Sequence, residues 1–163
     1  MKLLLVDDED FIRQGMCYTI PWEEHGLEVF EASNGEEALE IALRIRPDIV
    51  LTDISMPIMD GFELTRRLNQ SMPDTKVIIL TAYDTSDNLK EAIDVQVSGF
   101  LVKNADSQEI LSTVLKLKAE LEQERLHNEK MNQIQDIFNE NQMLIKATLV
   151  LSLIHISEPT RRS

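Results

Sequence analysis

Acidic, hydroxyl and basic side chains stand directly after four short apolar runs of the sequence. At these points the chain has Asp7 and Asp8, then Asp53, then Thr81, and finally Lys103. Carboxylates that gather in one place repel each other, so one takes up a proton or the group binds a cation. Mg²⁺ binds carboxylate, phosphate and water oxygens, and a carboxylate can itself accept a phosphoryl group. These residue types indicate metal-assisted phosphoryl transfer, in which a lysine neutralises developing charge.

The apolar runs must be strands that bring these side chains together. We expect strands over 2–6, 27–31, 49–51, 76–80 and 100–102, alternating with helices over 10–20, 33–46, 62–68, 87–95 and from 107 onward. A capping box of Ser33 and Glu36 should begin the second helix. Strict alternation with continuously apolar strands predicts an α/β fold, a doubly wound five-stranded parallel sheet with helices on both faces. Such sheets bind ligands at the carboxyl ends of their strands.

Composition excludes several classes of protein. The chain has 163 residues and a net charge of -13, so its surface repels nucleic acid and anionic membranes. Cys17 is its one cysteine, which excludes a disulfide-built scaffold. The first apolar run is too short for a signal peptide, and no run of about 18 apolar residues is present. We therefore expect a soluble, cytoplasmic protein.

Other α/β chemistries can be checked against the sequence. The five glycines have the spacing of neither a dinucleotide-binding nor a P-loop motif. An aspartate-nucleophile phosphatase would need a second acid two residues after Asp53, where Ser55 stands. Met56 and Met59 should pack the loop that follows this strand. Phosphoryl acceptance without turnover remains the favoured interpretation.

Residues 1–118 resemble the receiver domain of bacterial two-component response regulators. The matching segments, in chain order, are Leu5-Val6-Asp7-Asp8, Asp48 to Asp53, Met56 to Gly61, Ile79-Leu80-Thr81-Ala82 and Gly99 to Lys103. The resemblance implies the flavodoxin-like strand order 2-1-3-4-5.

The resemblance also implies a role for each matching residue. Asp53 would accept phosphate from the phosphohistidine of a sensor histidine kinase. Asp7, Asp8 and Asp53 would bind Mg²⁺, together with the backbone carbonyl of Ser55.

The remaining positions would form a phosphate-responsive switch. Thr81 and Ala82 would contact the phosphoryl group, Lys103 would pair with it, and Phe100 would turn inward when Thr81 moves. The family usually has proline after the lysine, in a cis bond, but this chain has Asn104. A cis bond without proline costs about 3 kcal/mol, so a trans or strained loop is expected.

The last helix should extend into a linker. Apolar residues with coiled-coil spacing are Ile110, Val114, Leu117 and Leu121, and after a one-residue slip the pattern continues through Ile134, Phe138, Asn141 and Ile145. We favour a parallel homodimer whose seam is formed by the first four. The alternative is a single amphipathic helix lying on its own domain.

Three segments are expected: a receiver domain over 1–118, a coiled-coil linker over 119–150 and an unstructured tail over 151–163. The tail resembles the translation of a sequencing-library adapter and would then be an artefact. The segment from Pro21 to Leu27 and the long linker resemble regulators that end in an AraC-type DNA-binding domain. DNA would be bound only through that output domain, which this chain lacks, and no membrane partner is expected.

The sequence therefore predicts a signalling module and not an enzyme. It would accept phosphate on Asp53 and relay it by conformational change and dimerisation, in the intact protein to transcription. The alternative is a receiver-like scaffold that acts through its coiled coil without phosphate. The complete set of acidic residues, with Thr81 and Lys103, favours the first.

Overall fold

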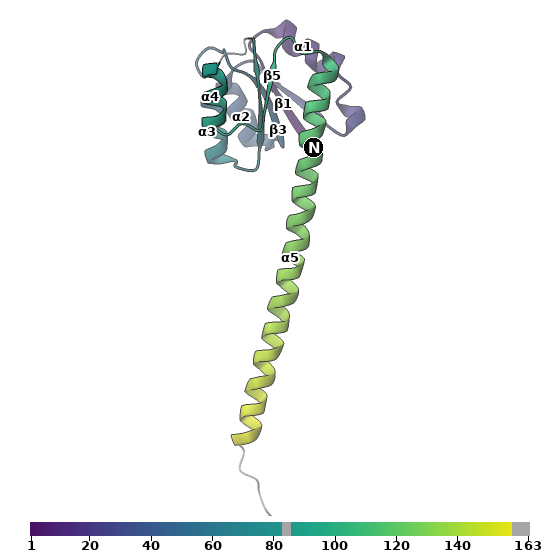
Figure 1. The fold of residues 1–163 in the computed structure, drawn as a ribbon, viewed down its shortest axis with the longest axis vertical. Helices are drawn as coiled ribbons and strands as arrows, with labels where there is room; N and C mark the ends of the chain where they lie inside the picture. The colour runs from purple at the N-terminus through teal and green to yellow at the C-terminus, as the bar shows by residue number, and fades with distance from the viewer. Residues whose placement is uncertain (83–85, 158–163) are drawn as a thin grey trace, which may run out of the picture. The chain divides into compact units, whose positions relative to one another are not determined.

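The computed structural model describes residues 1–82 and 86–157, and within them five strands alternate with five α-helices. The strands are parallel in the order β2-β1-β3-β4-β5, which confirms the predicted fold (Figure 1). In chain order the elements are β1 (Lys2–Val6), α1 (Asp10–Thr19), the 3-10 helix η1 (Glu23–His25), β2 (Glu28–Ala32), α2 (Gly35–Ile45), β3 (Ile49–Asp53), α3 (Gly61–Ser71), β4 (Lys76–Thr81), α4 (Ser86–Asp94), β5 (Gly99–Val102) and α5 (Ser107–Ser157).

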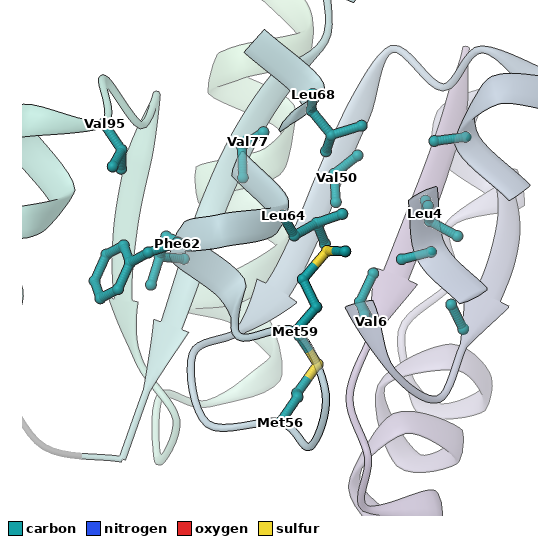
Figure 2. Packing of buried hydrophobic residues seen from close by; sticks show 14 of the residues in the cluster. Leu4, Val6, Val50, Met56, Met59, Phe62, Leu64, Leu68, Val77 and Val95 are labelled. Atoms are coloured by element: carbon teal, nitrogen blue, oxygen red, sulfur yellow. The ribbon is translucent and has the colours of Figure 1, made fainter. Parts of the chain in front are cut away.

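The core fills both faces of the sheet because successive strand residues point to opposite sides. Alternate residues such as Leu4, Val50 and Val77 pack under α2, α3 and α4, as Figure 2 shows. Their neighbours, including Leu3 and Leu51, are also fully buried and point to the other face. Burial on both faces is what gave β1, β3 and β4 their continuous apolar runs in the sequence. The edge strand β2 is more exposed and contains two glutamates.

The second helix begins one residue later than the capping box predicted. Asn34 is the N-cap, and its side chain accepts a hydrogen bond from the Glu37 N–H at 2.8 Å. The Glu37 carboxylate, and not that of Glu36, accepts from the Ser33 hydroxyl at 2.6 Å. Gly35, the first residue of the helix, packs against the loop before α3, because a Cβ there would lie 2.6 Å from the Met59 carbonyl oxygen.

The four residues predicted as a dimer seam are buried within a single chain. Ile110, Val114, Leu117 and Leu121 are 5%, 0%, 6% and 3% exposed. The first three belong to the compact unit Met1–Ala119. From Ile110 to Leu117 the alternative prediction is therefore the correct one: the helix packs on its own domain. The prediction of the seam was wrong because a 3-4 spacing over three turns fits an intramolecular apolar face as well as a coiled coil.

The second compact unit, Glu120–Ser163, consists of the rest of α5 in its described part. The helix continues to Ser157, so residues 151–157 are helical and not unstructured as expected. These residues include neither proline nor glycine, and Pro159 comes only two positions later. The remainder of the expected tail, 158–163, lies outside the described residues. No helix in the described part of the chain is long and apolar enough to cross a membrane.

Candidate functional site

The register of the sheet brings the predicted acids together at one edge. Val6 pairs with Thr52, so the residues that follow them, Asp7 and Asp53, lie side by side. Asp7, Asp8 and Asp53 each offer a carboxylate oxygen, and these oxygens lie within 4.8 Å of one another. Asp7 and Asp53 are buried, at 0% and 5% exposure, whereas Asp8 is exposed. The cluster therefore consists of two buried carboxylates and one exposed carboxylate beside them.

Lys103 supplies the positive charge of the site. Val102, the last residue of β5, pairs with Thr81 of β4. Lys103 follows Val102 and therefore lies beside the acids. Its Nζ atom lies 3.0 Å from Asp53 Oδ2, 3.2 Å from Asp7 Oδ2 and 3.0 Å from Glu9 Oε1. Burial lowers the pKa of Lys103, but the hydrogen bonds to Asp53 and Glu9 and the negative charges of Asp7 and Asp53 together raise it above its ordinary value. The ammonium group therefore stays charged beside the phosphoacceptor candidate.

Asp7 has one buried oxygen that no donor satisfies. Its Oδ1 accepts from the Glu9 N–H at 2.9 Å, while its Oδ2 accepts no hydrogen bond in the described structure and has only the ion-pair contact with Lys103 Nζ at 3.2 Å. Burial raises the pKa of Asp7, the Glu9 N–H and Lys103 oppose this rise, and the negative charge of Asp53 adds to it. A buried, unsatisfied carboxylate oxygen beside two further carboxylates is a donor set suited to a hard divalent cation such as Mg²⁺.

Two residues that sequence reasoning missed position the loop after β1. The Arg13 guanidinium donates to the Asp7 carbonyl oxygen at 2.7 Å and pairs with Asp10 and Glu31. The Glu9 carboxylate forms an ion pair with Lys103, which also pairs with the buried acids Asp7 and Asp53. Neither follows a strand directly, so the strand-end rule could not find them. The spacing of Arg13 three residues after Asp10 was the one available signal.

Thr81 is buried at the end of β4, with 3% of its surface exposed. Its Oγ1 accepts a hydrogen bond from Asn88 Nδ2 at 3.4 Å, a contact from α4 that the sequence did not indicate. Ala82 is exposed at this edge. Phe100, the predicted switch aromatic, is half-buried and packs against the core under α2, α3 and α4. The hydroxyl and the ring thus lie on neighbouring strands, β4 and β5.

The loop between β3 and α3 folds back tightly beneath the acids. The Gly61 N–H donates to the Ile54 carbonyl oxygen at 2.8 Å. A Cβ on Gly61 would lie only 2.3 Å from the Asp53 carbonyl oxygen. Met56 and Met59 are buried and point into the core, as predicted and as Figure 2 shows. The loop is thereby fixed at both ends.

Two exposed residues of the same loop remain at its surface. Ser55, predicted to offer its backbone carbonyl to the metal, is exposed two residues after Asp53. Ile58 is 81% exposed and has a φ of 73°. This is a left-handed conformation that β-branched residues rarely adopt. The loop that follows Asp53 therefore contains one residue with strained backbone.

The peptide bond between Lys103 and Asn104 is trans, as the missing proline suggested, since no described bond is cis. The Ala105 N–H donates to the Val102 carbonyl oxygen at 2.9 Å and closes a turn around these two residues. Lys103 reaches the acids from this turn, so the site does not require the usual proline.

Comparisons with known proteins agree with the geometry. A family model for the response regulator receiver domain matches residues 3–115. The chain is 37% identical over 130 residues to the uncharacterized transcriptional regulatory protein YesN of Bacillus subtilis, covering 79% of this chain and 35% of that protein. It is 36% identical over 115 residues to the transcriptional regulatory protein LnrK of the same organism, covering 71% of this chain and 52% of that one. The chain thus spans about a third to a half of these curated relatives.

Solved structures give the same result. The receiver domain of AraT, a response regulator from Geobacillus stearothermophilus, matches with a TM-score of 0.71 and 45% identity, covering 76% of this chain and 97% of that one. A two-component transcriptional regulator AraC from Clostridium phytofermentans matches with a TM-score of 0.69 and 29% identity, covering 78% and 98%.

Proposed function

The chain belongs to the response regulator receiver domain family, and from this premise we propose that Asp53 accepts a phosphoryl group from a sensor histidine kinase. The observation that carries the proposal is the contact of Lys103 Nζ with Asp53 Oδ2 at 3.0 Å, inside a cluster of three carboxylates. A buried carboxylate with a charged ammonium beside it is both a nucleophile and a site that can hold added negative charge.

The transfer is a substitution at phosphorus. A carboxylate oxygen of Asp53 forms the new P–O bond, while the P–N bond to the kinase histidine breaks and the ring nitrogen keeps the electron pair. Asp7, Asp8, Asp53 and the carbonyl of Ser55 would hold a divalent cation, which when bound would neutralise charge on the phosphoryl oxygens. The product is an acyl phosphate that stays on the chain, so the domain acts as a receiver and not as a turnover enzyme.

Lys103 and Thr81 are placed to respond to the product. Lys103 already contacts Asp53, and its raised pKa keeps the ammonium group positively charged. This charge would attract the negative phosphoryl group of an acyl phosphate. The Thr81 hydroxyl would exchange its long hydrogen bond with Asn88 for one to the phosphoryl group, with Ala82 beside it. Phe100 would then turn toward the space that Thr81 leaves. The phosphate would thus favour one of two states of the surface formed by β5 and its neighbours.

The relay beyond this domain is part of the proposal. The curated relatives are named as transcriptional regulators, and this chain spans a third to a half of their length. We propose that the switch alters homodimerisation and, in a longer protein, controls a DNA-binding output domain.

The proposal is tested by intact-mass spectrometry after incubation with acetyl phosphate and Mg²⁺. Wild type should gain one phosphoryl group, and Asp53→Asn should gain none. Asp60→Asn is the matched control, because Asp60 is an exposed N-cap in the neighbouring loop and should not affect labelling. Equal labelling of wild type and Asp53→Asn would refute the assignment. Absent labelling of a folded wild type would favour the scaffold alternative.

A further inference from the structure

The part of α5 after Leu121 carries large apolar side chains that no described residue covers. Ten such residues lie from Met131 to Leu151, and each is at least half exposed. Seven of the ten lie on three neighbouring lines along the helix. They are Met131, Ile134, Ile137, Phe138, Leu144, Ile145 and Leu151. A helix that exposes this much apolar surface is only marginally stable alone in water.

These residues form one stripe with a seven-residue repeat. Met131, Phe138 and Ile145 make one line along the helix, and Ile137, Leu144 and Leu151 make another. Between these lines runs a third, made of Ile134, Asn141 and Thr148. The three lines are here called the distal stripe; at 1.5 Å per residue it is about 30 Å long.

The distal stripe contains no charged residue, although the chain as a whole carries a net charge of -13. Acidic residues such as Asp136 and Glu140 lie outside it, and Gln135 bonds Asn139 at 3.1 Å on another face of the helix. Two copies of this stripe can therefore approach without the repulsion that the rest of the surface would cause.

A repeat of seven residues matches a partner helix that has the same repeat. Asn141 lies on the middle line of the stripe, where burial leaves its amide unsatisfied unless the partner offers another amide at the same height. A second copy of this chain, parallel and in register, does so.

We propose that two copies of this chain pair in parallel along the distal stripe, with Asn141 opposite Asn141. This surface replaces the buried seam that the sequence had suggested. The inference deepens the relay part of the proposed function and rests on it only for its signalling consequence, since pairing does not require phosphate on Asp53.

Cysteine cross-linking of the full chain tests the proposal. In a Cys17→Ser background, Ile134→Cys, Asn141→Cys and Thr148→Cys should each form disulfide-linked dimers under mild oxidation, because a disulfide needs Cα atoms within about 7 Å. Asp136→Cys and Asn139→Cys, on other faces of the helix, are the matched controls and should cross-link at least tenfold more slowly. An antiparallel pair would cross-link at one of the three stripe positions at most, and that pattern would overturn the proposal.

Sedimentation provides the second measurement. Ile134→Asp should weaken self-association at least tenfold, whereas Asn139→Asp should leave it unchanged. A monomeric wild type, a trimer or tetramer, or equal effects of the two variants would overturn the pairing. The same measurements on Asp53→Asn separate the two proposals, because pairing should persist in a variant that cannot accept phosphate.

Discussion

Gly61 offers a sharp test of how the fold holds the site, because it packs directly against the backbone of Asp53. A Cβ at this position would lie 2.3 Å from the Asp53 carbonyl oxygen and 3.1 Å from its carbonyl carbon. Side-chain Cβ atoms essentially never approach backbone closer than 3.0 Å. Gly61→Ala must therefore push β3 and α3 apart at the phosphoacceptor candidate.

The cost follows from overpacking and from one weakened hydrogen bond. Overpacking a tightly packed position costs about 1–3 kcal/mol, and the Gly61 N–H to Ile54 bond contributes about 1 kcal/mol. Gly61 has no positive φ, so no further backbone strain enters. We expect Gly61→Ala to lower the free energy of unfolding by about 2–4 kcal/mol.

Gly15→Ala is the matched control with the opposite sign. Gly15 lies inside α1, and nothing lies within 4 Å of the position that its Cβ would occupy. Alanine in a helix interior is more favourable than glycine by about 1 kcal/mol, so this variant should become more stable. The same chemical change thus gives opposite results at two positions of one domain.

Urea unfolding followed by Trp22 fluorescence measures both effects. Trp22 is the one tryptophan of the chain and is buried in the Met1–Ala119 unit, so its signal reports that unit and not the distal part of α5. The urea midpoint should fall for Gly61→Ala and rise for Gly15→Ala, with unchanged slopes. Unchanged stability of Gly61→Ala would refute the close packing of Gly61 against Asp53.

Three further predictions follow from the site. Burial raises the pKa of Asp7, so folding binds a proton and the free energy of unfolding falls as pH rises above about 4. In urea titrations without metal, Asp7→Asn should remove this fall. Added Mg²⁺ should raise the urea midpoint of Asp7→Asn less than that of wild type. Ile58→Asn should raise the unfolding free energy by about 1 kcal/mol, because asparagine tolerates a positive φ and Ile58 is 81% exposed; a lower midpoint would contradict this. Thr81→Ala should label at Asp53 yet lose any phosphate-dependent change in sedimentation, whereas Thr81→Ser should keep it.

The residues at the strand ends were predictable because a strand buried on both faces appears in the sequence as a continuous apolar run, whose end is easy to locate. β3 and β4 are continuous apolar runs that end in the polar residues Asp53 and Thr81. Because the two strands are parallel neighbours, both residues lie at the same edge of the sheet. Lys103 could be found for the same reason. The strand order needed the family resemblance, because hydrophobic pattern does not specify which strands are neighbours.

The errors have a different physical origin. The burial of Leu117 and the exposure of Ile134 depend on tertiary packing, while both residues fit the same periodic pattern along one helix. Glu9 and Asn88 join the site through contacts made by side chains that do not follow a strand. Ser33 and Asn34 are both residue types that favour the N-cap position, so the sequence did not distinguish them, and the structure places Asn34 there.

The central claim is that Asp53 forms an acyl phosphate, and borohydride reduction tests it most directly. Reduction of an aspartyl phosphate yields homoserine, which peptide mass spectrometry can locate in the sequence. After incubation with acetyl phosphate and Mg²⁺, homoserine should stand at position 53 and nowhere else. Homoserine at position 7, 8 or 60, or its absence from a chain that carries phosphate, would contradict the account.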